Sequence, residues 1–85
     1  MLYATAIVIQ SKFAFSTEPV NLRIDGAEPV WTDALRAARK LKIKGVSQSN
    51  EGAVKRLSGA GWQQWDLCTF RGQHVVARIQ LAWAL

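Results

Sequence analysis

Two stretches in the N-terminal part of the chain have patterns of apolar and polar residues that are typical of strands. Residues 20–24 alternate with a period of two, which is typical of a half-buried strand. Residues 3–10 are rich in Thr, Ile and Val and are apolar on both faces, which favours a central strand that continues through Phe13 and Phe15. Turn-forming residues at 16–19 separate the two segments. The N-terminal part therefore predicts a β-hairpin.

A second hairpin is predicted near the C-terminus, where residues 75–84 and 65–69 both alternate. A two-residue loop between them would place Asp66 on the buried face, whereas a three-residue loop at 71–73 places it opposite Arg78 on the open face. We prefer the three-residue loop, because it buries only compatible side chains. Its predicted partners are Thr69 and Val75, Leu67 and Ala77, and Trp65 and Ile79.

Helical spacing of apolar residues appears in the middle of the chain. Residues 32–42 predict a helix with Thr32 as its N-cap, basic residues in its last turn and Gly45 as its stop. Residues 43–47 could form a short extended piece. A second, shorter helix is predicted after Ser49 or Asn50, and its apolar face would consist of Ala53, Val54 and Leu57, with Gly59 and Gly61 ending it.

These elements together predict an α+β fold and a single domain over residues 1–85. Its antiparallel sheet has about four strands in two hairpins, both helices pack on one face, and the order is β-β-α-α-β-β. Residues that are apolar make up 49% of the sequence, which suffices for a core. We expect Trp65 and Trp83 in that core, and Trp31 and Trp62 over its edge.

Candidate chemistry is scarce in this sequence, so an enzyme is not predicted. Cys68 and His74 would lie diagonally on one sheet face, about 7–8 Å apart, too far for a nucleophile and its base. Gly59 and Gly61 close the second predicted helix and open a strand. The glycines of a phosphate-binding loop instead follow a strand and open a helix. One Cys and one His cannot form a zinc site. We expect no metal and no cofactor.

The cysteine content and the apolar segments suggest a cellular location. A single cysteine, Cys68, fits a reducing compartment. The apolar N-terminal segment lacks the positive flank and cleavage site of a signal peptide, and no stretch is long enough to span a membrane. We therefore expect a cytoplasmic protein without a membrane partner.

Charge supplies the main functional hint. Eleven Lys and Arg against six Asp and Glu give a net charge of +5, which either favours polyanionic partners or simply keeps a small protein soluble. The candidate contact residues are mostly on the outer face of the first helix, with one at the hairpin tip: Arg36, Arg39, Lys40, Lys42, Lys44 and Arg71. The simpler interpretation of these residues is a solvated helix face.

A small basic domain without catalytic residues is expected to act through its surface. The first hypothesis is a non-catalytic binding protein that docks on a larger protein or nucleoprotein complex. Small phage-type inhibitors of host defence, such as anti-CRISPR proteins, are one class with this size, although no motif establishes membership. The alternative is direct binding of DNA or RNA through the same helix face. A second copy of the chain is a further candidate partner, should the last strand lie at a sheet edge.

Overall fold

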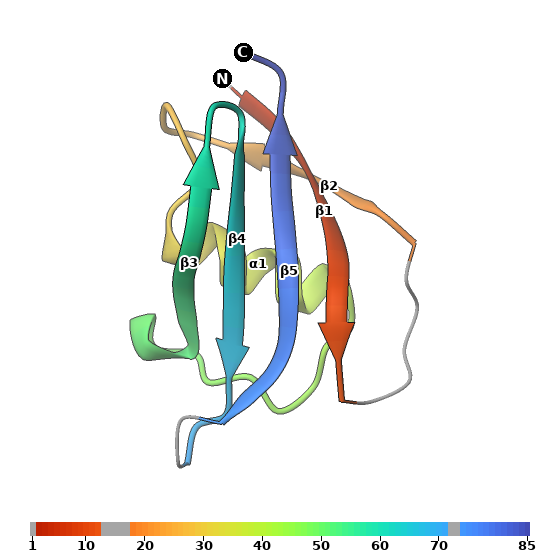
Figure 1. The fold of residues 1–85 in the computed structure, drawn as a ribbon, viewed down its shortest axis with the longest axis vertical. Coiled ribbons are helices and arrows are strands. Elements are labelled where there is room, and N and C mark those ends of the chain that lie inside the picture. The colour runs from red at the N-terminus through yellow and green to blue at the C-terminus, as the bar shows by residue number, and fades with distance from the viewer. Residues whose placement is uncertain (1, 13–17, 72–73) are drawn as a thin grey trace.

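One helix and a five-stranded antiparallel sheet make up this α+β fold (Figure 1). The computed structural model describes residues 2–12, 18–71 and 74–85. The strands follow the spatial order β2-β1-β5-β4-β3. In chain order the elements are β1 (Leu2–Ser11), β2 (Val20–Ile24), α1 (Trp31–Lys40), the 3₁₀ turn η1 (Asn50–Gly52), β3 (Ala53–Gly59), β4 (Trp62–Cys68) and β5 (Val75–Trp83).

The N-terminal hairpin is confirmed. Strands β1 and β2 pair antiparallel, with Ala4 opposite Leu22 and Ala6 opposite Val20. Ala4, Ala6 and Leu22 are buried in the core. Strand β1 is internal, because it also pairs with β5 on its other side. The predicted continuation of this strand through Phe13 and Phe15 lies outside the described residues.

Helix α1 begins and ends slightly earlier than predicted. Its N-cap is Val30 and not Thr32, and the Val30 N–H donates to a carboxylate oxygen of Asp33 at 2.9 Å. At the other end Lys42 adopts a left-handed backbone with φ of +61°. The N–H groups of Lys42 and Ile43 then donate to carbonyls of the last helical turn, so the helix stops before Gly45.

The predicted second helix is wrong, because residues 53–59 form the edge strand β3. Strand β3 carries a bulge between Lys55 and Leu57, which shifts its pairing with β4 by one residue. Val54 and Leu57 consequently share one sheet face although they are three residues apart. That spacing imitates the period of a helix, which explains the error.

The C-terminal hairpin largely follows the predicted register. Leu67 pairs with Ala77, and the open-face pair of Asp66 with Arg78 is present. The register shifts just beyond Leu67, so Val75 pairs with Cys68 and not with Thr69 as predicted. Residues 72 and 73 of the predicted loop lie outside the described residues. Of the short extended piece predicted at 43–47, the structure has a single bridge between Val46 and Thr69.

The core lies between α1 and the sheet face that it covers. Trp65 is buried there as predicted, and its indole N–H donates to Oε1 of Gln63 at 2.8 Å. The buried Gln63 amide in turn donates to the Pro29 carbonyl at 2.9 Å, which ties β4 to the segment that leads into α1. Trp83 is only partly buried and packs against the core.

Only one face of the sheet is covered by a helix in the described part of the chain. Figure 1 shows α1 behind the sheet, with β3, β4, β5 and β1 uncovered on the side toward the viewer. We call this uncovered side the open face. None of the described helices is long and apolar enough to cross a membrane.

Candidate functional site

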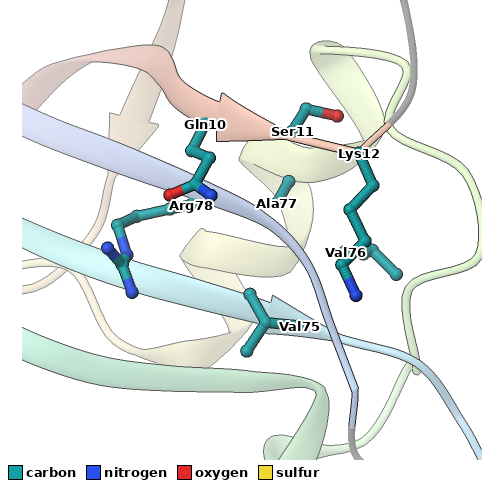
Figure 2. Close-up of a pocket in the computed structure, with 7 residues that line it drawn as sticks. All are labelled: Gln10, Ser11, Lys12, Val75, Val76, Ala77 and Arg78. Atoms are coloured by element: carbon teal, nitrogen blue, oxygen red, sulfur yellow. The ribbon is translucent and has the colours of Figure 1, made fainter.

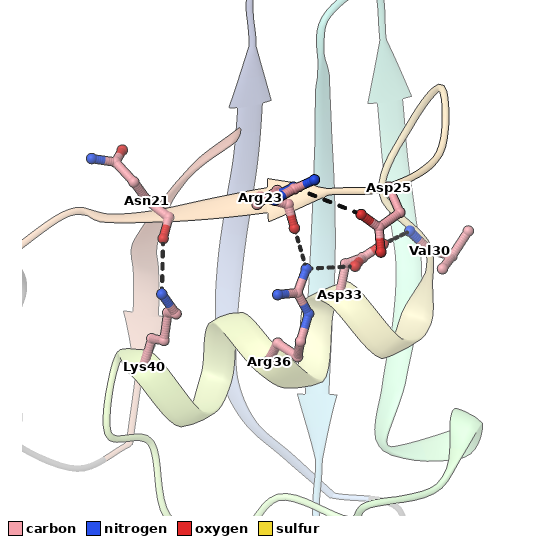
Figure 3. Close-up of polar contacts among 7 residues, drawn as sticks. All are labelled: Asn21, Arg23, Asp25, Val30, Asp33, Arg36 and Lys40. Atoms are coloured by element: carbon pink, nitrogen blue, oxygen red, sulfur yellow. Dashed lines mark hydrogen bonds and ion pairs between the residues drawn. The ribbon is translucent and has the colours of Figure 1, made fainter. Parts of the chain in front are cut away.

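Two of the residues predicted to contact a partner, Arg36 and Lys40, lie along the edge of strand β2 (Figure 3). Arg36 donates to the backbone carbonyl of Arg23, and Lys40 Nζ donates to the carbonyl of Asn21 at 3.3 Å. These carbonyls are two residues apart on an edge strand, so both point away from the sheet. Arg36 also forms an ion pair with Asp33 at 2.9 Å. Both cations therefore stabilise the fold.

A third predicted residue, Arg39, has a different neighbour. Its guanidinium donates to Oε1 of Gln48 at 3.1 Å, beside a hollow of about 250 Å³ that Trp31 and Leu35 also line. The indole of Trp31 is 38% exposed there. Arg36 lines this hollow as well, so two cations of α1 lie beside it. Their hydrogen bonds differ, because Arg36 and Lys40 contact β2 and Arg39 contacts the loop before η1.

The remaining predicted residues are exposed side chains on loops. Lys42 and Lys44 follow the end of α1, and Arg71 belongs to the connection between β4 and β5. Their participation in partner binding stays a prediction.

The open face gathers residues from all five strands, which the sequence analysis did not consider as a site. Alternation and register place fourteen side chains on it: Tyr3, Thr5, Ile7 and Gln10 of β1, Asn21 and Arg23 of β2, Val54 and Leu57 of β3, Trp62, Gln64 and Asp66 of β4, and Arg78, Gln80 and Ala82 of β5. Aromatic rings, amides and arginines thus share one surface with a few aliphatic side chains. In the sequence, this surface is indicated by the polar residues that alternate with apolar residues along the strands.

Asp66 is the only carboxylate among the open-face residues just named, and it is buried. Its oxygens accept a hydrogen bond from Arg78 Nε at 2.8 Å and form an ion pair with Arg56 Nε at 3.5 Å. Asp66 raises the pKa of Arg78 through this hydrogen bond and through its charge. Two cations around one anion leave a net positive charge, and both contacts use Nε, so they do not involve the Nη groups.

Of the two aromatic side chains of the open face, Tyr3 is exposed and Trp62 is partly buried. Tyr3 is 65% exposed at the start of β1. The indole of Trp62 lies over Gly59 on the neighbouring strand, since its Cε2 is 2.7 Å from the position that a Cβ of Gly59 would occupy. Glycine at this position therefore gives the ring room to lie against the sheet.

A hollow of about 190 Å³ lies where the end of β1 meets the start of β5 (Figure 2). Its polar walls are the side chains of Gln10, Lys12 and Arg78, and Val75 contributes an apolar wall. Figure 2 shows Arg78 and Lys12 on either side of Val75. Arg78 belongs both to this hollow and to the Asp66 ion pairs, so the hollow continues the open face.

Cys68 and His74 lie at the two ends of the connection between β4 and β5. Cys68 is buried, and its burial, assisted by the negative charge of Asp66, raises the pKa of the thiol. A thiol with a raised pKa is a poor nucleophile at neutral pH. No three potential metal ligands of the His, Cys, Asp and Glu types come together in the described residues.

Comparison of the chain with protein-family models, with curated proteins and with solved structures gives no significant match.

Proposed function

We propose that this protein is a non-catalytic binding protein that takes single-stranded nucleic acid on its open face. The observation that carries the proposal is the combination of an exposed tyrosine and a partly buried tryptophan with a positively charged ion-pair group on an uncovered sheet. Sheets that bind single strands stack unpaired bases on aromatic side chains and hold the backbone with cations.

The register sets the separation of the two stacking positions. Thr5 and Trp62 both pair with Ala82, so they lie in one row across three strands. Tyr3 is two residues further along β1. The Cα atoms of Tyr3 and Trp62 are therefore separated by about 10 Å across the strands and about 7 Å along them. A strand of nucleotides can cross this distance with bases placed at both rings.

Along the strands from Trp62, on the side away from Tyr3, and on β2 beside Thr5, the open face offers groups that can recognise base edges and phosphates. The amides of Asn21, Gln64 and Gln80 both donate and accept hydrogen bonds. Arg56 and Arg78 supply positive charge, and the net charge of +5 draws a polyanion toward the molecule.

The middle of the open face also argues against a protein partner on this side. Interface centres are depleted of charged residues and are more apolar than their surroundings. Here the middle holds Gln64 beside Gln80 and Asp66 beside Arg78. The hypothesis that the chain docks on a larger protein through its helix cations stays a prediction.

A binding titration with paired tryptophan variants tests the proposal. A fluorescent strand of about ten nucleotides should bind more tightly than the matching duplex, and its affinity should fall as salt rises. Trp62→Ala should weaken binding by about fivefold or more, because stacking is worth about 1–3 kcal/mol per base. Trp31→Ala is the matched control on the helix side, and it should leave the affinity unchanged.

Two results would contradict the proposal. One is the absence of binding to any single strand at low salt, which would direct attention to acidic protein partners. The other is an equal loss of affinity in Trp31→Ala and Trp62→Ala, which would mean that the open face is not the contact surface.

A further inference from the structure

The hollow at the end of the open face has a composition that suits one particular chemical group. Lys12 and Arg78 are cations, and the Gln10 amide adds further hydrogen-bond donors. The carboxylate that contacts Arg78, Asp66, is shared with Arg56. The hollow thus offers uncompensated positive charge to a small anion.

Its dimensions also restrict the ligand. At about 190 Å³ it is smaller than the pockets of about 300–1,000 Å³ that hold drug-sized molecules. A phosphate group is smaller than such ligands. A terminal phosphate carries a charge of about −1.5 to −2 and three acceptor oxygens, which match two cations and an amide better than the single charge of an internal phosphodiester does.

The backbone around the hollow is held by pairing between β1 and β5. Gln10 pairs with Arg78 across β1 and β5, immediately beyond the bulge at Ile9. The Lys12 N–H donates to the Val76 carbonyl at 3.1 Å, which holds the strand end against β5. Bulges commonly redirect side chains beside binding sites.

We infer that this hollow binds the terminal phosphate of a single strand that lies on the open face. The inference rests on the proposed function. It adds a preference for strands with a phosphorylated end, because the hollow lies where β1 ends and β5 begins, at one end of that face.

The test compares three versions of the same short strand, with a 5′-phosphate, a 3′-phosphate or two hydroxyl ends. One phosphorylated strand should bind about fivefold more tightly than the hydroxyl-ended strand, the gain expected from one charge-assisted contact. Lys12→Gln should remove most of this gain. Lys44→Gln loses the same charge on the helix side of the molecule, and it should retain the gain.

The phosphate preference should also depend on pH. The dianion of a terminal phosphate takes up a proton near pH 6 and becomes a monoanion, so the preference should decrease below that pH. Equal affinity for the three strands, or an undiminished preference in Lys12→Gln, would overturn the inference while leaving the proposed function intact.

A separate titration keeps the two proposals distinguishable. If no strand binds, the proposed function fails, and inorganic phosphate then probes the hollow alone by NMR. Shifts at the backbone amides of Gln10, Lys12 and Arg78 that are lost in Lys12→Gln would support an anion site. The absence of such shifts would overturn it.

Discussion

Among single residues, Lys42 has the least favourable backbone in the described part of the chain. It is the only described residue other than glycine with a positive φ, at +61°. This conformation costs most residues about 1–2 kcal/mol, and glycine adopts it without that cost. Lys42 nevertheless completes the hydrogen-bond pattern that ends α1.

Replacing Lys42 by glycine should therefore stabilise the protein. We expect Lys42→Gly to raise the free energy of unfolding by about 0.5–1 kcal/mol in urea denaturation, after the larger chain entropy of glycine is subtracted. Lys44→Gly removes the same charge where φ is not positive, and it should lower stability by about 0.5 kcal/mol. A loss of stability in Lys42→Gly would contradict this account of the helix end.

Cys68 gives a prediction about alkaline pH. Burial first, and Asp66 second, raise the pKa of this thiol above its ordinary value of 9.0. The folded state thus holds the thiol proton more tightly than the unfolded state does. Its contribution to stability is complete below about pH 9 and is lost as the pH rises through the raised pKa.

Unfolding free energies between pH 7 and 10 check this sign. Stability should decrease toward pH 10, and the decrease should be smaller in Cys68→Ala, which has no thiol to ionise. At pH 8, a thiol reagent should modify Cys68 only when the protein unfolds. Prompt modification of the folded protein would show that the thiol is accessible.

Among the elements, the two edge strands are protected in different ways. At β2, Arg36 and Lys40 of α1 occupy carbonyls that point out of the sheet. At β3, a bulge and the neighbouring residues Lys55 and Arg56 interrupt the edge. Charged side chains and bulges are the devices by which edge strands avoid pairing with other chains.

Removing the two cations should expose the β2 edge. The double variant Arg36→Gln, Lys40→Gln should self-associate at high concentration, and light scattering would detect it. The control is Lys42→Gln, Lys44→Gln, which removes two charges without touching β2 and should stay in the state of the unaltered protein. Similar scattering from both variants would mean that net charge, and not edge protection, prevents association.

Sequence patterns predicted the elements in which the spacing of apolar residues along the chain matches the face that is buried in the structure. The hairpin of β1 with β2, helix α1 and most of the β4–β5 register follow from alternation and helical spacing. Strand β3 could not be predicted in this way, because its bulge gives apolar residues the spacing of a helix. The shifted pairing of Cys68 has the same origin, since one irregular residue changes the register beyond it.

For the molecule as a whole, the candidate site was harder to predict than the fold. Charge density directs attention to α1, yet the structure uses Arg36 and Lys40 to cover a strand edge. The open face is assembled from five strands that are not all consecutive along the chain, and the order β2-β1-β5-β4-β3 brings them together. Tyr3 and Trp62 lie on the same sheet face only because of that strand order.

The tryptophan indole signals in an NMR titration with a single strand test the central claim most directly. Trp62 lies on the open face, Trp31 lies beside α1, and Trp65 is buried. We predict that the Trp62 indole signal shifts on addition of the strand while the Trp31 signal stays in place. A shift of Trp31 together with the amides of Arg39 and Lys42, with Trp62 unchanged, would contradict binding on the open face and assign it to the helix.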